Sequence, residues 1–192
     1  MRRSAILGLA AAAILCVAGA AAAEGLRWQL GYRNDVPAWV RIPGVGDKTT
    51  ISWYMTWEVE NRTGAARKPS VRTLLLTDTG KTFPDSGDPL TVEAVKKALQ
   101  VKEIAIAADL RKGIDDAAKV KGVATFGDVD KFAKKVELRV YGLLDPVTMV
   151  KGKQVYEVKF WQVKYERKGD EFGRTEDPWK QVSSAWVTEE PK

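Results

Sequence analysis

One ten-residue segment constrains the fold more than any other part of the sequence, because its side chains alternate between apolar and polar. Over residues 51–60, every second residue is large and apolar: Ile51, Trp53, Met55, Trp57 and Val59. A period of two places successive side chains on opposite faces of a β-strand, so the segment predicts a strand with one face in a core. Trp53 and Trp57 are therefore predicted core residues.

A second strand is predicted over residues 71–77, and we expect it to lie antiparallel beside the first. Asn61 to Gly64 supplies turn residues after the first strand, and Asp78 to Gly80 ends the second. Asn, Asp and Gly tolerate the left-handed backbone that a tight reversal needs. Asn61-Arg62-Thr63 also has the form of a glycosylation sequon, but we interpret it as the turn after the strand.

A helical pattern replaces the strand pattern over residues 89–100. The apolar residues spaced to share one helix face are Val92, Val95 and Leu99. Thr91 is predicted as the residue that caps the helix N-terminus. Beyond the helix, Glu103 to Ala107 is predicted as a short strand and Leu110 to Lys119 as a loop.

The second half of the chain returns to strand patterns. Strands are predicted over 122–126, 135–141, 154–166 and 181–187, and an edge strand over 28–32. Within 154–166 the apolar phase shifts between Phe160 and Trp161, which predicts a β-bulge at that point.

These patterns predict a mainly β fold. Many strands, one short helical insert at about 90–100 and no alternation of strands with helices favour an antiparallel immunoglobulin-like β-sandwich. No repeat or linker divides the chain, so we expect a single domain over 24–192, best defined over 50–187.

Residues 1–23 have the three parts of a secretory signal peptide. Arg2 and Arg3 form the positive region, Ile6 to Val17 is apolar, and Ala21-Ala22-Ala23 offers the small residues that signal peptidase requires. Cleavage is predicted after Ala23, which predicts a periplasmic or extracellular protein. The alternative is an uncleaved leader, which is just long enough to anchor the protein in the membrane.

The composition excludes several classes of chemistry. The chain has no histidine, and its one cysteine, Cys16, lies in the leader. Catalysis through histidine or a thiol, and zinc sites with histidine ligands, are therefore excluded from the exported part. No motif predicts a cofactor or a metal. The net charge of +6 is spread among interspersed acids and bases, so nucleic acid is not an expected partner.

Carboxylates are the remaining candidates for catalysis or metal binding. A glycoside hydrolase needs two of them, and the available acids are Glu58, Glu60, Asp78, Asp85, Glu166, Asp170 and Glu171. Loop acids suited to calcium are Asp109, Asp115, Asp116, Asp128 and Asp130. Most of these positions are typical of solvated turns, and the spacing of the calcium candidates matches no EF-hand or nonapeptide loop.

Tryptophan is abundant, with seven in the chain. Such residues fill the core of a protein without disulfides, or they present flat rings on which sugars stack. Three tryptophans outside the first strand are candidate ligand-binding residues: Trp161, Trp179 and Trp186. Trp179 follows Asp177-Pro178 in a polar segment and is the best candidate for an exposed ring.

Several motifs carry a resemblance to a known group. The segments that match are Trp53 to Gly64, Thr73 to Lys81, Gly122 to Phe126, Val136 to Gly142 and Tyr165 to Phe172 with Trp186-Val187. Together they resemble uncharacterised secreted bacterial proteins with a telokin-like immunoglobulin-fold domain. The resemblance implies the β-sandwich fold, and it implies no activity or catalytic residue.

The sequence thus predicts an exported, non-catalytic protein with a binding or structural role in the cell envelope or periplasm. Its expected partner is a protein or an envelope polysaccharide, and a membrane only if the leader is uncleaved. One alternative is a carbohydrate-binding module. A second alternative is a glycan-active enzyme that uses two carboxylates.

Overall fold

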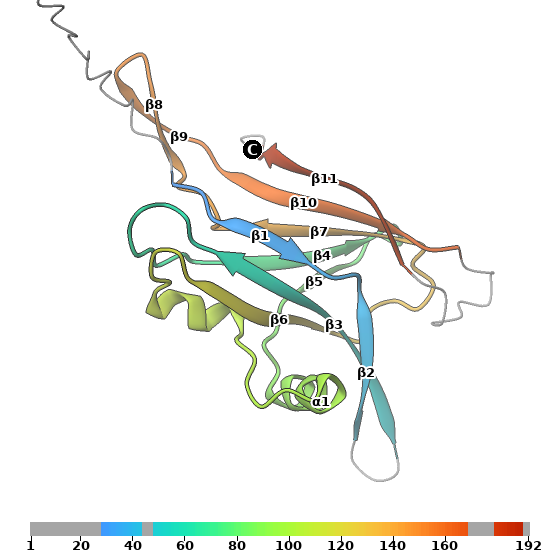
Figure 1. The fold of residues 1–192 in the computed structure, drawn as a ribbon. Helices are drawn as coiled ribbons and strands as arrows, with labels where there is room; N and C mark the ends of the chain where they lie inside the picture. The colour runs from blue at the N-terminus through green and yellow to red at the C-terminus, as the bar shows by residue number, and fades with distance from the viewer. Residues whose placement is uncertain (1–27, 44–47, 169–178, 190–192) are drawn as a thin grey trace, which may run out of the picture.

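The protein is mainly β, with antiparallel strand pairing in every sheet (Figure 1). The computed structural model describes residues 28–43, 48–168 and 179–189. The predicted leader therefore lies outside the described residues. Within the described ranges, no helix has the length and apolar character needed to cross a membrane.

The first sheet is built around one long strand, β3 (Thr49–Glu60), which contains the alternating segment. β1 (Gly31–Asn34) and β2 (Ala38–Pro43) pair in succession along one edge of β3, and β6 (Lys119–Gly127) pairs along the other. The prediction of a strand over 51–60 is confirmed.

The second sheet has the strand order β11-β10-β7-β4-β5. Its strands are β4 (Arg72–Thr77), β5 (Thr82–Pro84), β7 (Lys135–Tyr141), β10 (Lys159–Glu166) and β11 (Lys180–Thr188). Outside both sheets, β8 (Val147–Val150) and β9 (Lys153–Tyr156) form a hairpin that projects from one end of the molecule (Figure 1).

The expectation that the first two predicted strands are neighbours is wrong. β3 belongs to the first sheet and β4 to the second, where β4 pairs with β7 and β5. The chain between β3 and β4 does not form a hairpin turn. Instead, Arg67 in this connection exchanges two backbone hydrogen bonds with Ile114, each residue donating to the carbonyl of the other. Contacts distant in sequence therefore decide the pairing.

Asn61 stabilises the connection between β3 and β4 through hydrogen bonds in the interior of the fold. The side chain is fully buried, and its Nδ2 donates to the carbonyl oxygens of Ala65 (2.8 Å), Ile114 (2.8 Å) and Asp115 (3.1 Å). Its Oδ1 accepts from the backbone N–H of Thr63 at 3.1 Å. The predicted turn is present, and the buried amide leaves no room for a glycan on Asn61.

Replacing Asn61 by alanine is expected to lower the free energy of unfolding by roughly 1–3 kcal/mol, because buried carbonyls lose their donor. Urea unfolding followed by circular dichroism measures the loss. The matched control is Arg62→Ala. The Arg62 side chain is 76% exposed, so its removal should change the free energy of unfolding by less than about 0.5 kcal/mol. Equal effects of the two substitutions would contradict this role for Asn61.

The predicted helix is present as α1 (Pro89–Leu99), but its N-cap is Asp88 and not Thr91. The Asp88 carboxylate accepts from the backbone N–H of Thr91 at 2.8 Å and from its hydroxyl at 2.7 Å. Pro89 suits the first helical position because its missing N–H would have no partner there. Thr91 is buried, and its hydroxyl shares a hydrogen bond of 3.1 Å with the Ser52 hydroxyl, which ties α1 to β3.

Two further local predictions need correction. Glu103 to Ala107 is not a strand: only Ala105 makes an isolated parallel bridge, to Gly122. Part of the predicted loop after it is a 3₁₀ helix, η1 (Ala107–Lys112), because Leu110 turns inward and is 1% exposed.

The long strand predicted over 154–166 is in fact two strands, β9 and β10, which belong to different sheets. The irregularity in the pairing of β10 with β11 falls between Lys164 and Tyr165, not at Phe160–Trp161. Phe160 and Trp161 are consecutive in β10 and lie on opposite faces of the sheet, and Phe160 is buried where its ring lies 5.0 Å from that of Tyr141, so both phases are apolar at this point.

The core receives side chains from both sheets. Trp53 and Trp57 are 2% and 5% exposed, which confirms them as core residues. The second sheet contributes buried residues that include Leu75, Leu138 and Val163. Gly122 lies opposite Trp57, and a Cβ on it would fall 2.1 Å from the indole ring, so only glycine leaves space for that ring.

Tyr165 joins the two sheets across the core. Its hydroxyl accepts from Asn34 Nδ2 at 2.5 Å and donates to the carbonyl of Asp35 at 3.3 Å. Burial raises the pKa of Tyr165 to about 12 from 10.0, although the bond from Asn34 opposes that shift. The neutral hydroxyl is therefore the form that the fold stabilises.

This shift predicts how stability changes in alkaline solution. Because the folded pKa is raised, the contribution of Tyr165 is present below pH 10 and is lost as the pH rises through about 12. Denaturant unfolding at a series of alkaline pH values measures it. Tyr165→Phe should flatten the decline between pH 10 and 12, and an unchanged decline in that variant would contradict the assignment.

Candidate functional site

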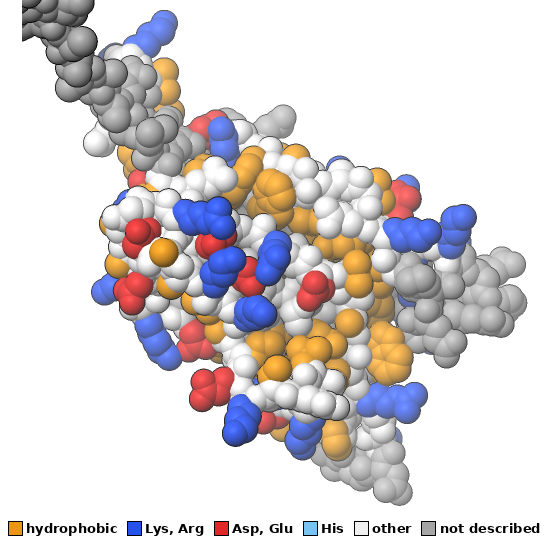
Figure 2. All heavy atoms as spheres, in the orientation of Figure 1, with side chains coloured by type: hydrophobic (Ala, Val, Ile, Leu, Met, Phe, Trp, Pro, Cys, Tyr) orange, Lys and Arg blue, Asp and Glu red, His pale blue; other side chains and the backbone are white. Residues whose placement is uncertain are grey.

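A hollow of about 610 Å³ lies on the outer face of the first sheet, beside the C-terminal end of α1. We call it the charged groove. Its charged residues are Arg33, Asp35, Glu58, Glu103 and Lys121, and its apolar residues include Leu99, Val101 and Ile104. Figure 2 shows acidic and basic side chains gathered over β1, β3 and β6 on this face.

The acids on β3 are held by cations from the strands on either side. Glu58 is 10% exposed and pairs with Arg33 at 2.9 Å and with Lys119 at 3.8 Å. The hydrogen bond from Arg33 lowers the pKa of Glu58, and burial opposes that shift only in part. Burial would raise the pKa of Glu60, but hydrogen bonds from Arg62 and Lys119 bring it below its usual value. Both acids are therefore ionised and fixed in place.

Three charged residues of the groove are not held by an ion pair. Asp35, Glu103 and Lys121 make no ion pair with any residue in the described ranges, although the charge of Lys121 helps to lower the pKa of Glu58. Glu103 and Lys121 also line an adjoining hollow of about 480 Å³, together with Ile104. The surface thus offers one positive and two negative side chains next to an apolar wall.

This arrangement suits binding better than acid–base catalysis. A general acid near neutral pH needs a raised carboxyl pKa, whereas Glu58 has a lowered one. In the described part of the chain, Asp85 is the carboxyl whose pKa is raised, by burial. It lies outside the groove and accepts from the backbone N–H groups of Thr125 (2.9 Å) and Gly87 (3.1 Å), which is a structural role.

The three candidate tryptophans do not form an exposed row. Trp161 and Trp186 face each other across the β10–β11 pair, with ring centroids 5.5 Å apart and planes at 64°. Both are half-buried and pack against the core. The prediction that Trp179 is an exposed ring is wrong, because that side chain is 7% exposed.

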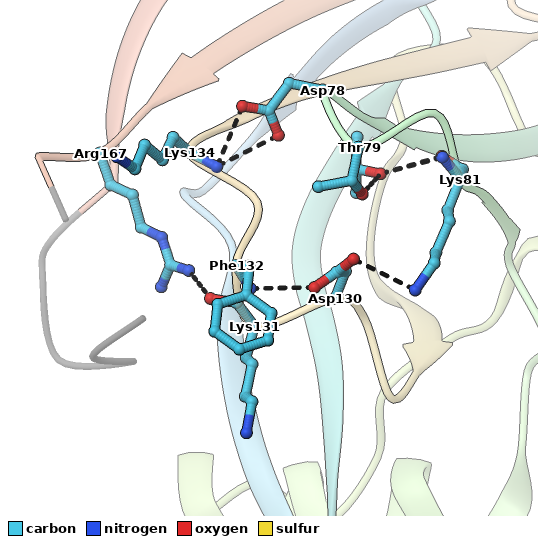
Figure 3. Close-up of polar contacts among 9 residues, drawn as sticks. Asp78, Thr79, Lys81, Asp130, Lys131, Phe132, Lys134 and Arg167 are labelled. Carbon is cyan, nitrogen blue, oxygen red and sulfur yellow. Dashed lines mark hydrogen bonds and ion pairs between the residues drawn. The ribbon is translucent and has the colours of Figure 1, made fainter. Parts of the chain in front are cut away.

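A buried arginine explains the position of Trp179. Arg167 is 6% exposed and lies 5.0 Å from the centre of the Trp179 ring and 5.9 Å from that of Trp53. Its guanidinium donates to the carbonyl of Ala133 at 2.9 Å and to that of Lys131, as Figure 3 shows in part. The two aromatic rings and the two carbonyls thus contribute to stabilising this buried cation.

The other candidate acids at this end of the molecule anchor loops. Asp78 accepts from the backbone N–H groups of Lys134 (3.2 Å) and Lys135 (3.1 Å), and Asp130 pairs with Lys81 at 3.1 Å (Figure 3). Asp170 and Glu171 lie outside the described residues. Among the described residues, no three acidic, histidine or cysteine side chains gather so that they could hold a metal.

Sequence reasoning did not find the charged groove. Arg33, Glu58 and Lys121 each lie on a different strand and only meet because β1 and β6 flank β3. The one available signal was the pair of glutamates on the polar side of the alternating segment, Glu58 and Glu60.

Comparisons of this chain with protein-family models, with curated proteins and with solved structures gave no match.

Proposed function

We propose that this chain is an exported, non-catalytic immunoglobulin-like β-sandwich that binds a polar segment of an envelope protein in the charged groove. The observation that carries the proposal is the presence of Lys121 and Glu103, without ion-pair partners in the described ranges, beside an apolar wall. A polypeptide segment supplies both signs of charge and apolar side chains together.

The sandwich assignment has support in the distribution of the core. Two antiparallel sheets contribute the buried residues of one cluster, as in proteins that pack two sheets face to face. Buried tyrosine and tryptophan side chains link the sheets, and the chain needs no disulfide to do so.

The alternatives have less support. Sugar stacking calls for flat exposed rings, whereas Trp179 is buried and Trp161 meets Trp186 edge to face. A glycoside hydrolase calls for a carboxylic acid that stays protonated near its substrate, whereas Glu58 is ionised against Arg33. Both remain alternatives to the binding proposal.

Export is tested by the N-terminus of the protein isolated from the cells that make it. Mass spectrometry of the intact protein is expected to show a chain that begins at Glu24, since cleavage after Ala23 removes the leader. A chain that begins at Met1 would contradict processing and favour a membrane anchor.

Binding in the groove is tested by site-specific photo-crosslinking in the same cells. A photoreactive amino acid at Val101, which is 40% exposed on the groove wall, is expected to give a discrete protein adduct. The matched position is Phe132, which is 54% exposed in the loop between β6 and β7. Equal adducts at both positions, or none at Val101, would overturn the proposal.

A further inference from the structure

The hairpin of β8 and β9 has more exposed apolar surface than its size explains. It belongs to neither large sheet. Large apolar side chains with high exposure within its ten residues are Val147 (40%), Val150 (49%), Val155 (40%) and Tyr156 (72%). A two-stranded hairpin is marginal in water by itself, so exposed apolar residues on it indicate that something else covers them.

The apolar residues occur on both faces of the hairpin. Val147 lies opposite Tyr156, so these two side chains share one face. Val155 and Val150 belong to the other face. Packing against one flat protein surface would cover one face only, whereas a lipid interface surrounds both.

The turn of the hairpin is basic. Lys151 and Gly152 form it with positive φ angles of 49° and 75°, and Lys153 follows. Both central residues of such a two-residue turn are left-handed, which favours Asn and Gly. Lys151 thus occupies a position that its local backbone preference disfavours, and with Lys153 it places two exposed cations beside the apolar residues.

The described part of the chain begins at the same end of the molecule as the hairpin. The carbonyl of Trp28, the first described residue, accepts from the N–H of Asp145 at 3.0 Å, and Asp145 lies two residues before β8. Residues 1–27, which include the apolar Ile6 to Val17, are therefore joined to the fold at the base of the hairpin.

We propose that the β8–β9 hairpin docks on the surface of an anionic phospholipid bilayer. Val150, Val155 and Tyr156 enter the interfacial region, and Lys151 and Lys153 contact lipid phosphates. Burial of apolar area and attraction between lysines and anionic lipids are the two contributions to such peripheral binding. This inference does not depend on the charged groove, because no groove residue belongs to the hairpin.

Vesicle sedimentation tests the proposal with the protein in the form isolated from cells. The probes are vesicles of phosphatidylcholine alone and of phosphatidylcholine with phosphatidylglycerol. We expect binding to the anionic vesicles that falls with added salt, and roughly ten-fold weaker binding for Lys151→Gln with Lys153→Gln. Val150→Ser with Tyr156→Ser should weaken binding by a similar factor, while Tyr156→Phe should retain it.

The matched control is Phe132→Ser. Phe132 is as exposed as the hairpin residues but precedes β7, whereas the hairpin follows the other end of that strand. This variant should bind within about two-fold of the unaltered protein. Circular dichroism of each variant establishes that it is folded. No binding to anionic vesicles, or equal binding by all folded variants, would overturn the membrane proposal and leave the groove proposal untouched.

Discussion

Replacing Trp53 by alanine is expected to lower the free energy of unfolding by about 3–5 kcal/mol. The side chain is 2% exposed, and its ring meets that of Trp179 edge to face, with centroids 5.9 Å apart and planes at 75°. The substitution removes a large buried side chain and also one of the two aromatic faces next to the Arg167 guanidinium. Urea unfolding of the variant measures the loss.

Two further variants separate packing from the aromatic contact. Trp186→Ala removes a half-buried tryptophan from the strand at the edge of the second sheet and should cost clearly less than Trp53→Ala. A double-mutant cycle of Trp53 with Trp179 should give a coupling of roughly 0.5–1.5 kcal/mol. Additive effects of the two substitutions would contradict a direct contact between the rings.

Replacing Gly142 by alanine is expected to lower the free energy of unfolding by about 3 kcal/mol or more. Gly142 has a φ of +79°, which side chains rarely adopt, and a Cβ there would lie 2.1 Å from the carbonyl oxygen of Ser70. The neighbouring atom belongs to the backbone, so the clash requires movement of the segment that leads into β4.

Gly80 provides a matched control for this variant. Its φ of +81° is nearly the same, and a Cβ on it would meet no atom within 4 Å. Gly80→Ala should therefore show only the conformational cost, roughly 1–2 kcal/mol, and the difference between the two variants measures the clash. Similar losses for both, in thermal or urea unfolding, would contradict close packing of Gly142 on Ser70.

Local patterns predicted the elements of this fold better than their partners. The strand over 135–141 has the predicted bounds, because alternation in one strand depends only on which face is buried. The partner of β3 could not be predicted in the same way. Its chain continues through Asn61, whose side chain is bound by carbonyls more than 50 residues away.

The burial of a side chain could not be predicted from its local sequence either, as Trp179 shows. Its polar neighbours, with Pro178 before it, are typical of a loop, and the prediction of exposure followed from them. Its burial depends on Trp53, which is remote along the chain, and on Arg167, and both meet it only in the folded protein.

The candidate site could not be predicted from the sequence for a related reason. Arg33 and Lys121 each occur among ordinary polar residues of a strand, and such residues usually face solvent without a specific role. They become a site only because β1 and β6 flank β3 and the segment after α1 closes one side. The glutamates of β3 gave a partial signal, and the basic residues that hold them gave none.

The central claim, that this chain binds an envelope protein through the charged groove, is tested most directly by crosslinking from Val101 in three backgrounds. These are the unaltered chain, Lys121→Gln, which removes a groove cation, and Lys135→Gln, which removes a cation on the second sheet. We predict a discrete adduct that Lys121→Gln reduces roughly ten-fold and that Lys135→Gln leaves unchanged. An adduct of equal yield in all three backgrounds would contradict the claim.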